Sequence, residues 1–190
     1  VSWPLTLPMC SPISDGAAAA ILCREEELDR FDRSRAVKIH ATALRTGSDR
    51  DPQEFDRHIT HLAARDAYAR AGLGPEDMHV AEVHDATAFA EIQQVENLGF
   101  CDFGEGGALT ESGATSIGGR IPVNLSGGLE SKGHPVGATG LAQVFELTTQ
   151  LRGEAGARQV ANAKFAIAEN GGGFHGIEEA VACVTILGRT

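Results

Sequence analysis

The sequence predicts an α/β fold, a layered and mixed β-sheet with helices on both faces. Strand-like apolar runs alternate with amphipathic helical runs over residues 36–153, and a glycine follows each predicted helix. Such alternation is typical of a sheet covered by helices on both sides. Two strong β runs near the C-terminus, separated by NGGGFHGI, predict a closing hairpin, whose antiparallel pairing makes the sheet mixed.

The first 50 residues predict two strands separated by a charged connector. Residues 18–23, AAAILC, are short and apolar, which favours a buried strand. Residues 24–35 carry many charges, and such a run predicts a solvated segment. Residues 36–47 predict a strand in which Val37, Ile39 and Ala41 alternate.

Residues 51–74 predict a helix. Asp51 suits the N-cap, Pro52 suits the first turn, and Gly72 ends the pattern. The apolar stripe of this helix consists of Phe55, Ile59, Leu62 and Ala63.

The remaining elements follow the same logic. In order they are a strand at 77–85, a helix at 86–99, a polar glycine-rich loop at 100–122, a helix at 137–153, and strands at 163–169 and 179–187. The helix at 86–99 has an apolar side formed by Phe89, Ile92, Val95 and Leu98. The helix at 137–153 is expected to direct inward Leu141, Val144, Phe145 and Leu151.

Composition and charge narrow the function. The 190 residues, 42% hydrophobic and 22% charged, suffice for one soluble domain with its own core. A formal net charge of −10 argues against nucleic acid as a partner. No apolar run approaches the ~20 residues of a membrane span, and the proline-broken N-terminus does not resemble a signal peptide. Four cysteines without CxxC spacing argue against zinc and predict a reducing, cytoplasmic compartment.

Polar residues gather at three predicted element ends. His84 and Asp85 lie where a strand gives way to a helix, His134 lies before the last predicted helix, and Glu169 and Asn170 end a strand. In α/β sheets, ligands bind at the carboxyl ends of strands and at helix N-termini. Each position also has a structural explanation, because the histidines and Asp85 could cap helices and Glu169 could face water.

A metal site is not expected. His58 and His61 have an i, i+3 spacing that suits a metal, but no third ligand lies nearby in the sequence. The spacing therefore favours a solvated helix face.

Three stretches carry a resemblance to a known family. Residues 122–160, PVNLSGGLESKGHPVGATGLAQVFELTTQLRGEAGARQV, closely resemble the C-terminal half of thiolases, especially sterol carrier protein-type (lipid-transfer) thiolases. Residues 82–107, EVHDATAFAEIQQVENLGFCDFGEGG, resemble their H-D-C-F segment and the helix after it. Residues 11–22, SPISDGAAAAIL, resemble the end of a thiolase N-terminal half.

The resemblance implies an architecture. Thiolases consist of two related halves, each a mixed five-stranded sheet with helices on both faces. Residues 1–23 then correspond to the tail of the N-terminal half, residues 24–35 to a charged connector, and residues 36–190 to the C-terminal domain. A homo- or hetero-oligomer is the family expectation.

The resemblance also implies roles. In the family, the histidine of the GHP motif activates a nucleophilic cysteine and contributes to an oxyanion hole, and this role corresponds to His134. The first residue of H-D-C-F completes that hole and corresponds to His84. The glycine of C-x-G donates a backbone N–H to a second oxyanion hole and corresponds to Gly171.

The same resemblance implies the substrate. Thiolases act on acyl-CoA, with coenzyme A as substrate or acyl carrier and without a metal. The wall of the substrate site corresponds to the N-P-S-G-G turn, here with Leu125 in place of proline, and comprises Asn124, Ser126, Gly127 and Gly128.

The chain departs from the thiolase pattern in its cysteines. The nucleophilic cysteine belongs to the N-terminal half, and no cysteine here stands in its context. The second catalytic cysteine is also absent, because the C-x-G position is Glu169 and the H-D-C-F cysteine position is Ala86. A buried Glu169 could shuttle a proton in its place, since burial raises a carboxyl pKa.

Three hypotheses follow for the function. The first is the C-terminal half of a thiolase-like enzyme, inert without a nucleophile-bearing half. The second is part of a thiolase-like aldolase, favoured by the loss of both cysteines. The third is a non-catalytic subunit that binds acyl-CoA or acts as a scaffold.

Overall fold

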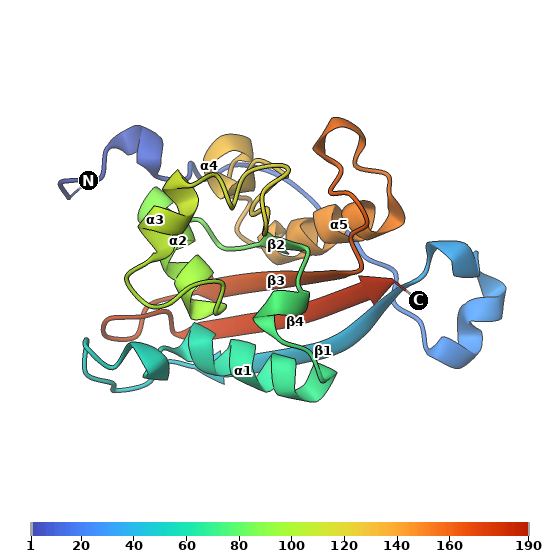
Figure 1. Cartoon of the computed structure of the whole chain (residues 1–190), viewed down its shortest axis with the longest axis horizontal. Coiled ribbons are helices and arrows are strands. Elements are labelled where there is room, and N and C mark those ends of the chain that lie inside the picture. The colour runs from blue at the N-terminus through green and yellow to red at the C-terminus, as the bar shows by residue number, and fades with distance from the viewer. Residues whose placement is uncertain (1, 190) are drawn as a thin grey trace.

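The computed structural model describes residues 2–189 and contains one mixed sheet between helices (Figure 1). The strands are β1 (Val37–Thr46), β2 (Val80–Glu82), β3 (Phe165–Gly172) and β4 (Val181–Arg189). The helices are α1 (Ile59–Ala71), α2 (Ala88–Asn97), α3 (Gly106–Glu111), α4 (Gly128–Lys132) and α5 (Thr139–Arg152). The α/β class and the mixed sheet predicted from the sequence are confirmed.

The sheet has the order β1-β4-β3-β2. Strand β4 is antiparallel to both β1 and β3, whereas β2 runs parallel to β3. The expectation of five strands is therefore wrong, because the described sheet has four.

The outer edge of β2 shows why a fifth strand does not form. Val123 makes one isolated parallel bridge with Ala81, through hydrogen bonds of 2.9 Å on either side. The chain cannot extend this pairing, since Pro122 has no N–H to donate and Asn124 turns away with a φ of 52°. A single bridge thus occupies the place where a fifth strand would lie.

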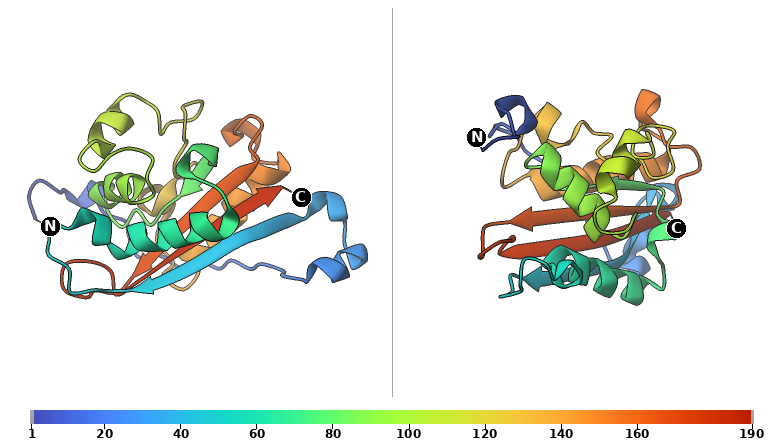
Figure 2. Two further views of the ribbon diagram at one scale, coloured as in Figure 1. Left: turned by 60° about the horizontal axis from the view of Figure 1, so that its bottom comes forward. Right: turned by 60° about the vertical axis from the view of Figure 1, so that its left-hand side comes forward.

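Two hydrophobic clusters lie on opposite faces of the sheet. Helix α1 packs against β1 and β4, and its alanines join Val95 of α2, Leu98 just after α2 and Ile167 of β3 in one cluster. Helix α5 covers the other face, where Leu147 and Leu151 pack on β2, β3 and β4. Figure 2 shows α1 lying along one side of the strands.

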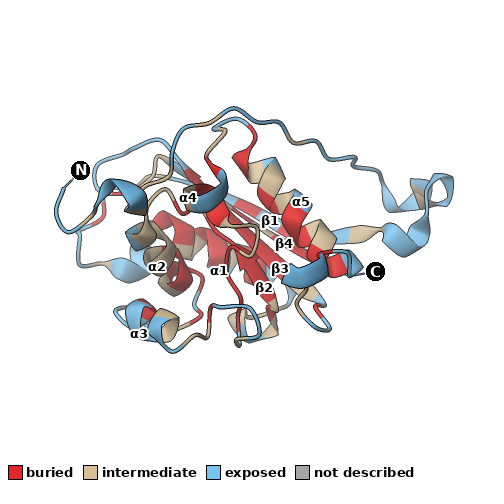
Figure 3. Cartoon of the chain, turned by 90° about the horizontal axis from the view of Figure 1, so that it is seen from above, coloured by how far each residue is buried: buried red, intermediate tan, exposed pale blue. Residues whose placement is uncertain are grey.

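Residues 2–36 wrap around the domain instead of joining the sheet (Figure 3). The predicted strand at 18–23 is wrong, because this segment is mostly exposed and has no regular structure. A strand needs a hydrogen-bonded neighbour, and no strand of residues 2–189 lies beside it. The charged residues 24–35 form exposed 3-10 turns, as expected for a solvated connector.

Several side chains predicted to face the core are exposed. Ile39 is 47% exposed because a bulge between it and Ala41 shifts the alternation of β1. Helix α1 begins at residue 59, after an N-cap by His58, so that Phe55 lies outside it. His58 itself is buried, which contradicts the expected solvated face.

Helix α5 is turned relative to the prediction. Phe145 is 63% exposed and Leu141 43% exposed, whereas Gln143 is only 1% exposed. The buried face of this helix thus includes polar residues beside Leu147 and Leu151, and part of its apolar side faces outward. Both α1 and α5 end as predicted, since Gly72 and Gly153 adopt the left-handed conformation after them.

Candidate active site

The structure brings His84 and His134 together from distant parts of the chain. His84 follows β2, and His134 follows α4 and precedes α5. Their ring centroids lie 4.9 Å apart at an interplanar angle of 86°. In each ring, Nδ1 contacts a neighbouring side chain, whereas Nε2 has no hydrogen-bond partner among residues 2–189 and is not closed off from solvent. The two rings are therefore in contact, and both Nε2 atoms are available to a hydrogen-bond partner from outside the described residues.

Asp85 fixes the distance between the two histidines. Its carboxylate accepts hydrogen bonds from the backbone N–H groups of Leu129 at 2.7 Å and Glu130 at 3.3 Å, at the start of α4. The N-terminus of this helix has donors without partners in the helix, and a carboxylate satisfies them. The capping role considered for the His84–Asp85 pair thus belongs to Asp85, which ties the end of β2 to the helix that leads to His134.

Residues 12–14 hold the backbone of His134 from the other side. The N–H of His134 donates to the carbonyl of Pro12 at 2.8 Å, and the N–H of Ser14 donates to the carbonyl of His134 at 3.3 Å. Gly133 has a φ of 93°, and a Cβ there would lie 2.5 Å from the Ser14 hydroxyl oxygen. The close approach of this segment therefore requires glycine at position 133.

The ring of His134 is oriented by Thr139, in the first turn of α5. Nδ1 of His134 lies 2.7 Å from the Thr139 hydroxyl oxygen, which itself lies 3.3 Å from the carbonyl oxygen of Pro135. When the hydroxyl donates to that carbonyl, its oxygen accepts from the Nδ1–H of the ring. Nε2 of His134 then carries a lone pair that can take up a proton.

The ring of His84 contacts an amide instead. Nδ2 of Asn170, from β3, lies 3.2 Å from Nδ1 of His84 and 3.2 Å from Oε1 of Gln143. Burial, reinforced by the neighbouring His134, lowers the pKa of His84 to about 4. His84 is therefore neutral at physiological pH.

Glu169 lies next to Asn170 but on the opposite face of β3. Its carboxyl is fully buried and accepts the backbone N–H of His84 at 3.0 Å, while its other oxygen has no partner among the described residues. Burial raises its pKa to about 8; the His84 hydrogen bond opposes this, and the carboxylates of Glu179 and Asp85 reinforce it. The structure thus brings the amide of Asn170, and not this carboxyl, against the imidazole rings.

Gly171 occupies a position where no side chain fits. A Cβ at this residue would lie 2.7 Å from Cγ of Glu179 and 3.2 Å from its carboxyl carbon. Glu179 is in turn held by Nε2 of Gln94, at 2.9 Å. The packing of Glu179 therefore requires glycine in β3 beside the site.

The Asn124–Gly128 turn uses its polar side chains inside the protein. Asn124 accepts the N–H of Val83 at 2.8 Å and donates to Glu91 at 2.7 Å. Ser126 binds the carboxyl of Glu82 through its N–H at 3.1 Å and its hydroxyl at 2.6 Å.

The two glycines of this turn, Gly127 and Gly128, have φ values of 99° and 57° and lead the chain into α4. Burial raises the pKa of Glu82 to about 7, although its Ser126 contacts and Lys132 oppose the shift. The turn therefore anchors α4 to β2 through side chains that all have partners.

Sequence reasoning named Asn170 only as a polar residue at a strand end, and it missed Thr139 and Gln143; these three residues contact the two histidines or each other. A signal existed in the spacing of Thr139 and Gln143, because i and i+4 lie on one helix face. The period of 2 in β3 also places Glu169 and Asn170 on opposite faces. The prediction placed the apolar residues of α5 on its inward face, and for that reason it overlooked both signals.

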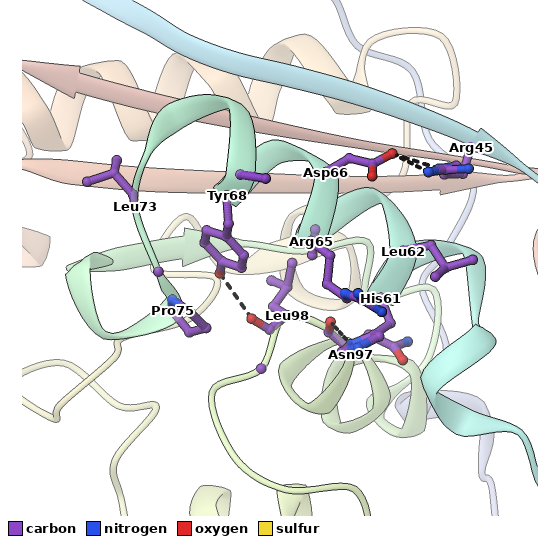
Figure 4. A pocket seen from close by; sticks show the side chains of 14 residues that line it. Arg45, His61, Leu62, Arg65, Asp66, Tyr68, Leu73, Pro75, Asn97 and Leu98 are labelled. Atoms are coloured by element: carbon purple, nitrogen blue, oxygen red, sulfur yellow. Dashed lines mark hydrogen bonds and ion pairs between the residues drawn. The ribbon is translucent and has the colours of Figure 1, made fainter.

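The cavities lie elsewhere or at the margin of the site. A cavity of about 490 Å³ lies between α1 and the end of α2, lined by Arg45, Arg65, His61 and Tyr68 among others, and contains none of the predicted site residues (Figure 4). A second cavity of about 380 Å³ adjoins the His134 loop and is lined by residues 14–18 and 135–138.

Residues 2–189 contain no cluster of three or more His, Cys, Asp or Glu side chains that could hold a metal. No helix in the same range is long and apolar enough to cross a membrane.

The mixed sheet between helices and the two adjoining histidines, one after β2 and one before α5, match the architecture and the site that the resemblance to thiolases implies. The chain belongs to the Thiolase C-terminal domain-like family, whose model matches residues 41–189.

Curated relatives agree with this membership. Acetyl-CoA acetyltransferase of Methanothermobacter thermautotrophicus is 48% identical over all of this chain and 49% of its own length. Sterol carrier protein 2 of Rattus norvegicus is 46% identical over 87% of this chain and 32% of its own length. Benzoylsuccinyl-CoA thiolase subunit BbsB of Thauera aromatica is 36% identical over 84% of this chain and 42% of its own length.

Among solved structures, the Ltp2-ChsH2(DUF35) aldolase is similar with a TM-score of 0.66 and 26% identity, over 80% of this chain and 39% of that chain. The chain therefore spans half or less of the length of each of these proteins.

Proposed function

We propose that this chain is the C-terminal half of a thiolase-like enzyme that acts on acyl-CoA thioesters by acyl transfer or carbon–carbon bond cleavage. The observation that carries the proposal is the pair His84 and His134, in edge-to-face contact with both Nε2 atoms free. The names of the relatives, which include an acetyl-CoA acetyltransferase and a thiolase subunit, support the same substrate class. Residues 1–23 are then the tail of an N-terminal half, 24–35 the connector and 36–190 the C-terminal domain.

In this proposal His134 acts as the base. Its Nε2 takes the proton of a cysteine thiol that the N-terminal half supplies, and the thiolate attacks the thioester carbonyl. The carbonyl oxygen becomes an oxyanion, which the Nε2–H groups of protonated His134 and of His84 stabilise. The oxyanion collapses as the C–S bond of the substrate breaks, the CoA sulfur leaves, and the acyl group stays on the cysteine. Removing one such donor costs about 10²–10³-fold in kcat. In this proposal the backbone N–H of Gly171 donates a hydrogen bond in the second oxyanion hole.

The carbon–carbon step favours a second candidate, an aldolase. Both family positions for the second cysteine lack a thiol here, at Ala86 and Glu169. Retro-aldol cleavage of a β-hydroxyacyl-CoA needs a base for the hydroxyl proton but no acyl-accepting thiol. The buried carboxyl of Glu169, with its pKa of about 8 and one oxygen without a partner, carries a proton at neutral pH, which supports the role of the acid that protonates the released enolate, while His134 is the base. The aldolase among the similar structures supports the same candidate.

The partner in this proposal is the nucleophile-bearing half, and the assembly is a homo- or hetero-oligomer. The apolar side chains of Phe89, Val136, Leu141 and Phe145 are exposed in this chain, which supports a covering partner. The four cysteines are all free, which supports a reducing compartment such as the cytoplasm.

The test compares this chain alone with this chain joined to the part of the Methanothermobacter thermautotrophicus relative that it does not match. Each preparation is assayed for CoA-dependent cleavage of acetoacetyl-CoA and for cleavage of a β-hydroxyacyl-CoA. We expect no activity from the chain alone and activity from the joined protein, lost on replacing His134 by alanine. Acetoacetyl-CoA cleavage identifies acyl transfer, and β-hydroxyacyl-CoA cleavage alone identifies the aldolase. Binding of acyl-CoA without turnover in the joined protein would overturn the proposal in favour of a scaffold.

A further inference from the structure

Two amide side chains connect the ring of His84 to a backbone carbonyl. Nε2 of Gln143 donates to the carbonyl oxygen of Glu169 at 2.8 Å. Oε1 of Gln143 lies 3.2 Å from Nδ2 of Asn170, and the same Nδ2 lies 3.2 Å from Nδ1 of His84. Gln143 is 1% exposed, so that water does not compete for its amide.

The two side-chain amides of this hydrogen-bonded series, Gln143 and Asn170, each have only one possible orientation. A backbone carbonyl can only accept, so the nitrogen of Gln143 faces it and the oxygen of Gln143 faces Asn170. An oxygen can only accept from Asn170, so Asn170 presents its nitrogen. Its two hydrogens then go to Gln143 and to Nδ1 of His84. Since Nδ1 accepts, the proton of the neutral ring is on Nε2.

We propose that Gln143 and Asn170 are positioning residues that hold His84 in the tautomer protonated at Nε2, so that it presents a hydrogen-bond donor next to the ring of His134. The part of this inference that concerns an oxyanion rests on the proposed function, whereas the tautomer itself does not. The two imidazoles are thereby set for different tasks. His134, whose Nδ1 contacts a hydroxyl, can present a lone pair, and His84 presents a hydrogen.

The geometry explains why the position before Gly171 carries an amide. A carboxylate at Asn170 would have no hydrogen to give, so it would attract a proton to Nδ1 of His84. The neutral ring would then present the lone pair of Nε2 to any developing negative charge, which repels it. The lowered pKa of His84, about 4, agrees with a ring that carries a single proton at neutral pH.

The direct test is the protonation of the His84 ring nitrogens, measured by long-range ¹H–¹⁵N correlation spectra of the 190-residue chain labelled at histidine. Loss of signals in His84→Asn assigns the ring. We expect Nε2–H and unprotonated Nδ1 from pH 6 to 8. In Asn170→Asp the proton should move to Nδ1, and in Gln143→Met both tautomers should be populated. The matched control is Gln150→Met, another buried amide on the same face of α5 that is hydrogen-bonded far from the histidines.

The outcomes separate cleanly. Nδ1–H in the wild-type chain overturns the inference, as does an unchanged ring in both Asn170→Asp and Gln143→Met. Should one variant fail to fold, the other carries the test, and Nδ1–H in the wild-type chain overturns the inference without either.

In the joined enzyme, Asn170→Asp should lower kcat by about 10²-fold with little change in KM, as for removal of one oxyanion donor, and Gln150→Met should not. An inactive joined enzyme with the expected wild-type tautomer would overturn the proposed function and leave the tautomer assignment standing.

Discussion

Replacement of Glu169 by glutamine separates the cost of its buried charge from its packing. The amide keeps the size of the side chain and can still accept the N–H of His84, but it does not titrate. In the wild-type chain the pKa of Glu169 rises from an ordinary value of 4.5 to about 8 because the carboxyl is fully buried. Below pH 4.5 the group is protonated in both the folded and the unfolded state and has no effect. Between pH 4.5 and 8 the folded state holds a proton that the unfolded state releases, so stability falls as pH rises.

The magnitude follows from that interval. A displacement from 4.5 to about 8, at about 1.4 kcal/mol per pH unit, amounts to about 5 kcal/mol at pH 9. The free energy of unfolding of the wild-type chain should therefore decline relative to Glu169→Gln by about 1.4 kcal/mol per pH unit from pH 5 to 8 and level off above that range. The amide hydrogens without a partner lower the stability of Glu169→Gln by a constant amount that does not change this slope.

Urea unfolding of both chains at each pH from 4 to 9, followed by circular dichroism, measures the difference. The matched control is Glu111→Gln, at an exposed position at the end of α3, for which the difference should not change with pH. Parallel stability curves for the wild-type chain and Glu169→Gln would refute the reasoning, because they would mean that the carboxylate is solvated or paired in the folded state.

Three further substitutions test other parts of the structure. Arg50→Met should lower the free energy of unfolding by about 3–5 kcal/mol, because it leaves the buried carboxylate of Glu178 without its 2.7 Å partner; urea unfolding at pH 7 measures the loss. Gly171→Ala should cost about 1–3 kcal/mol by overlap with the neighbouring glutamate, whereas Gly172→Ala, in open space, should cost less than about 1 kcal/mol; thermal unfolding compares the two. Asp85→Ala should cost about 1–2 kcal/mol by uncapping α4, and hydrogen exchange should show faster opening of that helix.

Each of these has a result that contradicts it. An Arg50→Met loss no greater than that of Arg30→Met, which removes an exposed ion pair, would mean that Glu178 finds water or another partner. Equal effects of alanine at positions 171 and 172 would remove the steric reason for glycine, and a Glu179→Ala background that fails to relieve Gly171→Ala would do the same. Unchanged exchange at α4 in Asp85→Ala would show that this carboxylate does not hold the helix.

The sequence predicted those features that depend on a few neighbouring residues. Gly72 and Gly153 end their helices because a left-handed residue is a local requirement, and the N-cap of α2 falls at Thr87 within the expected boundary. The β3–β4 hairpin follows from two β-rich runs joined by glycines. The resemblance singled out His84 and His134, although composition alone could not bring them together.

The predictions that failed concern which surface an element meets. Residues 18–23 have the composition of a buried strand but find no strand to pair with in residues 2–189. Phe145 and Leu141 were assigned to the core because they are apolar, yet α5 meets the sheet through Gln143, Leu147 and Leu151. An apolar stripe indicates that one face of a helix is buried in a contact. It does not indicate whether the contacting surface belongs to the same chain.

The sequence by itself determined the α/β class, the ends of the two long helices and the identity of the two histidines, since these are encoded by period, by glycine and by short motifs. Only the tertiary structure decided that the sheet has four strands, because one proline and one left-handed asparagine after β2 end the pairing at Val123. Only the tertiary structure also placed Asn170 rather than Glu169 at the imidazole of His84. The reason is that a strand sends neighbouring side chains to opposite faces, and the position of α5 decides which of those faces the site uses.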